Sequence, residues 1–486
     1  MEAIWQRIVR PRHEAATDSA TTAPARQELV QFVNASLVTE DGLRRQGELW
    51  VQGGHVVDPQ ARFWQREAKA TDRRIDCKGM LLAPGMIDIM LYGAFGVDFS
   101  ALGGEGDEAT AEAERAVSNV CARLPEIGVT AFCPAVRPCS PATYTRLLER
   151  LVPPQDPPQV EGVRQGADGG SCGSPASGAR LLGVHLDGPF LSREYAPDPK
   201  APVRERVDGN ALHDVFGAAR LQSAAVVTIA PELPGALDAI RELSARGVVV
   251  GIGRTGATLA QSEAAMGAGA RLVTHALSSM PPFHHRDPGP IGVLASCNAD
   301  GAGEVGGSMP QDAGAEGEAR VSASEVFFSM AVVGQHAAPT VNLARAVHPD
   351  GLVLLSSADS SADARAVAKS GDAKAAGAAM VAGDAKAAGN AKAAGAAKPV
   401  DGHTLVDGAR MLWQCSGTAD PAAALLCASA HPARLLGLGK KGSLAPGADA
   451  DLVLLDPTDL TVQACFVGGQ LAWAHPQLHG ALWFHS

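Results

Sequence analysis

Aromatic residues are scarce in this sequence, and it has neither a long apolar run nor an excess of positive charge. Phenylalanine, tryptophan and tyrosine make up only 4% of its 486 residues. No run of about 18 apolar residues occurs, so we expect no membrane-spanning helix. The formal net charge is −11, because 52 acidic residues outnumber 41 lysines and arginines. This balance argues against nucleic acid or an anionic membrane as a partner.

Cysteine pairs with metal-binding spacing are missing too. The nine cysteines are scattered, and no two of them stand in a Cys-x-x-Cys pattern. Reduced thiols in a cytoplasmic protein are therefore the simplest interpretation. Residues 1–27 are polar and lack a continuous apolar stretch, which predicts a disordered leader. Their Arg, Ser and Thr content leaves an organellar transit peptide as the alternative.

Strand-like patterns occur at both ends of the chain. Residues 28–83 contain short apolar runs and a Gly-Gly turn at 53–54. The same pattern returns at about 439–476, with a second Gly-Gly turn at 468–469. Glycine pairs between apolar runs are typical of β-hairpins. We therefore expect the two ends to form one small β-sandwich domain together.

The middle of the chain, residues 84–438, alternates apolar strand-like runs with helix-like runs. The runs at 181–186, 226–230 and 248–252 are apolar enough to be buried strands. Repeated β-then-α units predict a parallel sheet, and their number favours an α/β fold of the (β/α)8 TIM-like barrel type. Polar residues follow the strands, at the mouth where barrel enzymes place their active sites.

Three low-complexity segments interrupt this alternation, at about 153–179, 299–320 and 369–398. The last one repeats the sequence GDAKAAG and contains almost no bulky apolar residue. Such a composition cannot bury enough surface to offset the entropy lost on ordering. We expect all three to be surface insertions.

Two polar residues end apolar strands of the predicted barrel. Asp187 closes the run at 181–186, and His275 follows Val273-Thr274. Taken alone, an Asp before Gly-Pro is more often a turn residue, and a lone histidine is more often structural. At two strand ends of one barrel, however, the pair also suits a metal site, which needs about four N, O or S ligands.

Several longer motifs identify a family. They are APGMID at 83–88 with GAFGVDF at 93–99, HLDGPFLSRE at 185–194, APE at 230–232, THALSSMPPFHHRDPG at 274–289 and the tail HPARLLGLGKKGSLAPGADADLVLLD at 431–456. On these motifs the chain resembles the N-acetylglucosamine-6-phosphate deacetylases of the amidohydrolase superfamily.

The resemblance implies a divalent, zinc-like metal cofactor, a phosphorylated amino sugar as substrate and a homodimer. In this family a Glu and two His residues hold the metal, which activates water and polarises the acetamide carbonyl. An Asp at the end of the last barrel strand acts as general base and then as acid. The products are glucosamine 6-phosphate and acetate.

The family's metal ligands match this sequence only in part. Asp187 stands at the position of the Glu, and His275 at that of the second His. Arg254 replaces the first His. A guanidinium has no lone pair to offer and stays protonated, so Arg254 cannot bind a cation. We expect Arg254 to pair with Asp187 at the mouth of the barrel instead.

The catalytic Asp of the family also has no direct counterpart. Ungapped, its position falls on Ser357. Asp359 or Asp363 takes that place only if the strand end is shifted.

The substrate-binding positions carry a mixture of matches and replacements. Met90 and Tyr92 stand where the family has Gln and Asn. The remaining candidates for substrate binding are Ser278 and Ser279, which replace Asn-Ala, together with Arg286 and His336, which match the family.

Three interpretations of the function follow. The chain is an N-acetylglucosamine-6-phosphate deacetylase-like hydrolase; or it is a catalytically inactive barrel that binds a ligand or a protein partner; or the Arg254 guanidinium replaces the metal as electrophile. Because positions 254 and 357 serve separate steps of the reaction, we expect weak or lost deacetylase activity.

Overall fold

The computed structural model describes residues 27–60, 71–151, 178–207, 209–217, 220–296, 326–333, 335–356 and 403–478. Several predictions fall outside these residues. They concern residues 1–26 of the leader, residues 153–177 of the first insertion, the insertions at 299–320 and 369–398, and the candidate bases Ser357, Asp359 and Asp363.

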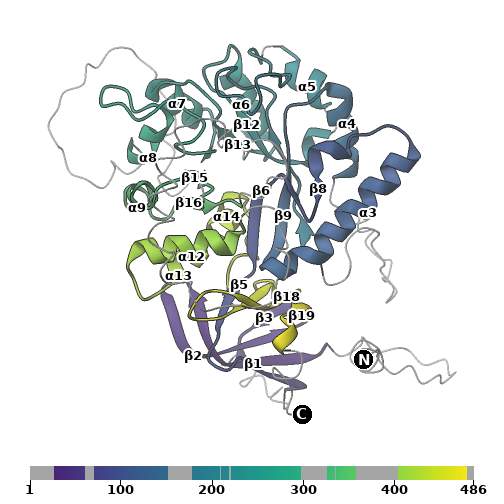
Figure 1. Cartoon of the computed structure of the whole chain (residues 1–486), viewed down its shortest axis with the longest axis vertical. Coiled ribbons are helices and arrows are strands. Elements are labelled where there is room, and N and C mark those ends of the chain that lie inside the picture. Colours follow the sequence, from purple (N-terminus) through teal and green to yellow (C-terminus); the bar gives the residue numbers. More distant parts are fainter. Residues whose placement is uncertain are drawn as a thin grey trace, which may run out of the picture.

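A parallel sheet forms a nearly closed barrel in the upper part of the molecule (Figure 1). Around the barrel the strands follow in the order β6 (Met86–Leu91), β9 (Val129–Val136), β11 (Val184–Asp187), β12 (Ala224–Ile229), β13 (Val249–Ile252), β14 (Leu272–Val273), β15 (Phe327–Met330) and β16 (Leu352–Leu354). A short extra strand, β10 (Arg180–Leu181), pairs with β9. The predicted (β/α)8 barrel is thereby confirmed.

Alternating residues of these strands fill two different spaces. On β9, Ala131 and Ala135 belong to the cluster inside the barrel, together with Phe327 of β15. Phe132 and Val136 of the same strand belong to the larger cluster beneath the surrounding helices. A strand buried on both faces needs apolar residues at both alternating sets, which explains the continuous apolar runs in the sequence.

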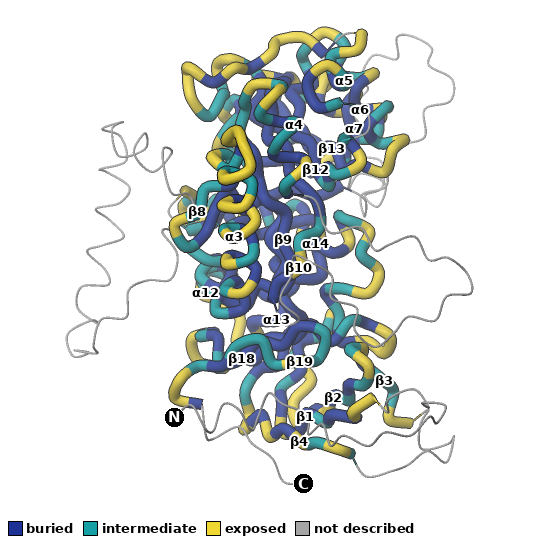
Figure 2. Tube along the Cα trace, turned by 90° about the vertical axis from the view of Figure 1, so that its right-hand side faces the viewer, coloured by how far each residue is buried: buried dark blue, intermediate teal, exposed yellow. Residues whose placement is uncertain are grey.

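Helices pack against the barrel, and Figure 2 shows exposed and half-buried helical turns outside dark, buried strands. Their bounds are α3 (Asp107–Arg123), α4 (Pro141–Arg150), α5 (Ala211–Phe216), α6 (Ala236–Ala245), α7 (Leu259–Gly267), α8 (Val293–Ser296), α9 (Ala338–Val347), α12 (Leu405–Ser416), α13 (Ala422–Leu426) and α14 (Ala430–Leu435). Capping boxes at Thr258/Gln261 and Thr404/Asp407 fix the start of α7 and α12. No helix in the described ranges has the length and apolarity to cross a membrane.

Both ends of the chain share one sheet below the barrel (Figure 1). The N-terminal strands are β1 (Leu29–Thr39), β2 (Gly42–Gln52), β3 (His55–Val57), β4 (Arg73–Asp76) and β5 (Leu81–Pro84), and the C-terminal ones are β17 (Leu452–Leu455), β18 (Val462–Val467) and β19 (Gln470–Ala474). β5 pairs with β17, which joins the two groups, and the rings of Phe32 and Phe466 lie 5.1 Å apart in the shared core. The expected β domain built from both ends is present; its exact boundaries stay a prediction.

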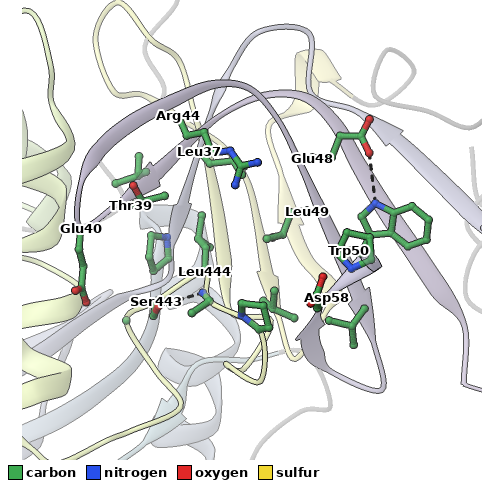
Figure 3. A pocket seen from close by; sticks show the side chains of 18 of the residues that line it. Leu37, Thr39, Glu40, Arg44, Glu48, Leu49, Trp50, Asp58, Ser443 and Leu444 are labelled. Atoms are coloured by element: carbon green, nitrogen blue, oxygen red, sulfur yellow. Dashed lines mark hydrogen bonds between the residues drawn. The ribbon is translucent and has the colours of Figure 1, made fainter. Parts of the chain in front are cut away.

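A cavity of about 600 Å³ opens in this β domain (Figure 3). Leu37, Leu49 and Leu444 form an apolar part of its lining, and Glu40 and Arg44 are among its polar residues. Among the residues that the structure describes, none of those predicted to form the active site lines this cavity.

Candidate functional site

Four side chains meet where strands of the barrel end. Asp187 is the last residue of β11, and Tyr92 directly follows β6. Arg254 lies two residues after the end of β13, and His275 two residues after the end of β14. Because the strands are parallel, their carboxyl ends open at the same mouth. Arg254 and His275 have left-handed backbone conformations, with φ of 48° and 50°. Such angles are uncommon outside glycine and cluster at functional sites.

Asp187 lies at the centre of this group. Its Oδ2 accepts hydrogen bonds from the Tyr92 hydroxyl at 2.6 Å and from Arg254 Nε at 2.7 Å. His275 Nε2 lies 3.6 Å from the same oxygen and 3.3 Å from the Tyr92 hydroxyl. Asp187 is fully buried and Arg254 is 4% exposed. The pairing of Arg254 with Asp187 that the sequence suggests is thus present.

The charges of this group shift the pKa values of Asp187 and Tyr92. Burial works against ionisation of Asp187, but the Arg254 guanidinium and His275 outweigh it and hold the pKa of the carboxyl well below its usual range. Burial, together with the negative charge of Asp187, raises the pKa of Tyr92. At neutral pH the site therefore holds an ionised carboxylate between a fixed cation and a neutral phenol.

The other oxygen of Asp187 has a different environment. Oδ1 is buried and has no hydrogen-bond partner among the described residues. A buried carboxylate oxygen without a partner is costly, and native structures contain few such atoms. All the contacts described for this carboxylate therefore converge on a single oxygen.

Comparison with known proteins assigns this chain to a family. Residues 181–472 match the amidohydrolase family. The N-acetylglucosamine-6-phosphate deacetylase of Rattus norvegicus is 36% identical over 467 residues, which cover 94% of this chain and 97% of that protein. The Homo sapiens enzyme of the same name is 35% identical over 457 residues, covering 92% and 96%. The chain belongs to the N-acetylglucosamine-6-phosphate deacetylase family.

A solved structure of this family supports the same conclusion. The N-acetyl-D-glucosamine-6-phosphate deacetylase of Mycobacterium smegmatis is 26% identical and aligns with a TM-score of 0.61, covering 91% of this chain and 99% of that one. The amidohydrolase family is generally metal-dependent.

The described residues do not fit the metal that the deacetylase family implies. They contain no group of three or more His, Cys, Asp or Glu side chains that could hold an ion. At the mouth of the barrel the donors are Asp187 and His275, and Oδ2 of Asp187 already accepts from Tyr92 and Arg254. Zinc needs about four ligands, and the fixed charge of Arg254 repels a cation. We therefore derive no metal-assisted step for this chain.

Three of the predicted substrate-binding residues lie beside His275. The Ser278 hydroxyl donates to the His275 carbonyl at 2.9 Å, and Ser279 N donates to the same carbonyl at 3.3 Å. His336 lies with its two ring nitrogens 3.0 Å from the carbonyls of Ala331 and Ala276. These contacts hold the loop after β14 against the segment after β15.

Arg286 lies apart from this group. It is exposed, and its backbone N–H donates to His284 Nδ1 at 3.3 Å. No contact described for it reaches Asp187, Arg254 or His275. Its predicted role in binding phosphate stays a prediction, as do the roles of the other site residues.

Sequence reasoning missed the part that Tyr92 plays. The sequence identified Tyr92 only as a replacement for the Asn of the family, whereas in the structure its hydroxyl contacts Asp187 directly. The guanidinium of Arg137 lies 4.3 Å from the centre of the Tyr92 ring and also contacts Asp98 at 3.3 Å. The available signal was the presence of a rare tyrosine, one of three in the chain, directly after a barrel strand.

Glu232 is a second residue that the sequence did not single out for the site. It accepts hydrogen bonds from the Thr255 hydroxyl and, at 2.7 Å, from Gly256 N. These contacts fix the loop that directly follows Arg254. The APE motif of the family thus has a structural effect here, because it supports the backbone that carries the arginine.

Proposed function

We propose that this chain binds N-acetylglucosamine 6-phosphate at the mouth of its barrel and hydrolyses the acetamide to glucosamine 6-phosphate and acetate. The observation that carries this proposal is the 36% identity to a deacetylase of that specificity over 94% of the chain. At that identity and coverage, loop and core residues match together, which supports a shared ligand class better than a shared fold alone does.

Polar residues around His275 are candidates for contacting the sugar. Ser278 and Ser279 contact the His275 carbonyl and His336 contacts the Ala276 carbonyl, and we propose that these residues share or exchange those contacts with the sugar hydroxyls. We propose Arg286 as a phosphate contact, since a guanidinium binds phosphate oxygens in a bidentate manner. The family's base position falls on Ser357, whose hydroxyl is not basic at neutral pH, so we propose Asp359 as the base of a hydrolysing enzyme.

A second candidate function is binding of the sugar phosphate without hydrolysis. The ion pair between Arg254 and Asp187 favours it, because the resemblance assigns both residues to metal-ligand positions of the family. The comparisons lend no support to a loss of activity, since the relatives named above are deacetylases. The two candidates therefore have to be separated by experiment.

The deciding experiment measures binding and turnover on the same purified full-length protein. Isothermal titration calorimetry with N-acetylglucosamine 6-phosphate reports binding, and an acetate assay reports hydrolysis. Acetate release at an ordinary enzyme rate, on the order of 10 per second, supports the deacetylase. Binding without acetate supports the second candidate. If the protein neither binds nor cleaves the sugar phosphate, both proposals fail; unphosphorylated N-acetylglucosamine is the control for the role of the phosphate.

We propose in addition that the chain forms a homodimer and acts in the cytoplasm. Family membership supports the first and the scattered cysteines support the second. Light scattering on the purified protein measures the mass in solution, and a monomer would contradict the dimer.

A further inference from the structure

One buried arginine stands at the centre of the barrel mouth. Arg254 is 4% exposed, and its Nε donates to Asp187 Oδ2 at 2.7 Å. A fully buried carboxylate stays ionised when a positive charge and hydrogen-bond donors compensate for its lost hydration. In this chain the guanidinium supplies both. Asp187 therefore has its counter-charge from within the chain.

Tyr92 makes a second hydrogen bond to the same oxygen of Asp187. Its hydroxyl donates to Asp187 Oδ2 at 2.6 Å, and Arg254 Nη2 donates to the hydroxyl at 3.3 Å. The phenol therefore bridges the carboxylate and the guanidinium. Any ion that used Oδ2 would have to displace two donors, one of which carries a full positive charge.

Two further residues hold Tyr92 in this position. The Arg137 guanidinium stacks over the tyrosine ring at 4.3 Å from its centre, and Asp98 holds Arg137 at 3.3 Å. The contacts thus run from Asp98 through Arg137 and Tyr92 to Asp187 and Arg254. Replacing Arg254 alone leaves this support intact and leaves the phenol on the carboxylate.

We propose that Arg254 is the resident cation of this site, that Tyr92 seals it against metal ions, and that sugar-phosphate binding at the barrel mouth is metal-independent. The ligand class in this statement rests on the proposed function; the exclusion of metal does not. Two residues share the exclusion, so restoring a metal site requires changing both.

The carboxylate itself is still suited to a metal once these two residues are gone. In a chain with Arg254→His and Tyr92→Asn, Oδ2 loses both of its close donors, and Oδ1 has no partner among the described residues. His275 and the new histidine add two imidazole nitrogens. One carboxylate, two imidazoles and water complete a four-coordinate site.

The first test measures metal binding in four proteins: the wild type, Arg254→Lys, Arg254→His, and Arg254→His with Tyr92→Asn. Cobalt(II) is the probe, because its visible absorption reports coordination, and elemental analysis after dialysis reports retained metal. We expect no retained cobalt in the wild type or in Arg254→Lys, which keeps the charge. We expect one ion per chain in the double variant, bound on the order of 10- to 100-fold more tightly than by Arg254→His, because the ion no longer displaces a hydrogen bond to a charged group.

Two outcomes of this test overturn the proposal. One is a wild type that retains a metal ion after dialysis. The other is an Arg254→His variant that binds cobalt as tightly as the double variant, because Tyr92 would then have no sealing role. Circular dichroism reports whether each variant folds. If the double variant does not fold, the wild-type and Arg254→Lys measurements still decide whether the native site takes a metal.

The second test measures the affinity of the wild type for N-acetylglucosamine 6-phosphate with a chelator and with added zinc. We expect the same dissociation constant in both solutions. Binding that appears only with zinc overturns metal independence. No binding in either solution contradicts the proposed function instead, while the cobalt measurements remain a test of the exclusion.

Discussion

Tyr92 and Arg254 donate to the same oxygen of Asp187, at 2.6 and 2.7 Å, although Tyr92 comes from the first barrel strand and Arg254 from the fifth. Two donors on one buried oxygen fix the carboxylate in place. We therefore expect these two contacts to affect the stability of the barrel mouth and its response to pH.

Arg254→Ala is expected to lower the free energy of unfolding by about 3–5 kcal/mol, because it leaves Asp187 buried without its counter-charge. Urea denaturation measures the effect. Arg241→Ala is the matched control, since Arg241 pairs with Asp238 at a similar distance of 2.8 Å but on the surface. That change is expected to stay within about 0.5 kcal/mol. Equal losses in the two variants would contradict the importance of burial.

Asp187 should make the folded protein sensitive to acid. Its folded pKa is lowered by Arg254, so the stability it contributes is fully present above the unfolded value, about 3.9, and is lost as the pH falls below it. Urea midpoints measured between about pH 2 and 5 should therefore decline more steeply in the wild type than in Asp187→Asn. If the urea midpoints of the two proteins fall equally with pH, the Asp187 carboxyl is not the source of the acid sensitivity.

Tyr92→Phe removes the hydroxyl and keeps the ring under Arg137. We expect a loss of about 1.5–3 kcal/mol in unfolding free energy, because the lost hydrogen bond goes to an ionised carboxylate. Tyr195→Phe is the comparison, since Tyr195 is partly exposed and a change there should cost no more than about 0.5 kcal/mol. A Tyr92→Phe protein as stable as the wild type would show that Arg254 alone satisfies Oδ2.

If the wild type binds the sugar phosphate without hydrolysing it, gaining turnover should need more than building the metal site. Arg254→His, Asp187→Glu and Tyr92→Asn together address metal binding, but the family's base position falls on Ser357. We expect acetate release from N-acetylglucosamine 6-phosphate to rise only when Ser357→Asp is added, since a hydroxyl cannot act as the general base at neutral pH. A rise without Ser357→Asp would assign the base to Asp359 or to another residue.

Deleting residues 369–398 is expected to leave the melting temperature nearly unchanged. The repeat has almost no bulky apolar residue and cannot contribute to a core. Calorimetry compares the deleted protein with the full chain. A loss of more than about 2 kcal/mol would mean that the segment packs against the domain, since surface changes usually cost about 0.5 kcal/mol or less.

The sequence by itself determined the barrel, the family and three residues of the site. Continuous apolar runs such as Val129–Val136 identify strands that are buried on both faces, and their alternation with helices predicts the parallel barrel. Asp187, Arg254 and His275 could be placed together because each follows such a strand. The carboxyl ends of parallel strands in one barrel share a mouth, so local position was enough to bring them together.

Only the tertiary structure decided what those residues contact. Tyr92 lies 95 positions before Asp187, and no local pattern shows that its hydroxyl reaches that carboxylate while Arg137 covers its ring. Closure of the barrel is a similar case: the Ser356 hydroxyl, after the last strand, donates to Asp88 on the first at 2.5 Å, across 268 positions. Such contacts depend on strand register and on how far the sheet curls before its edges meet. Those are properties of the whole barrel, so no single segment of the sequence encodes them.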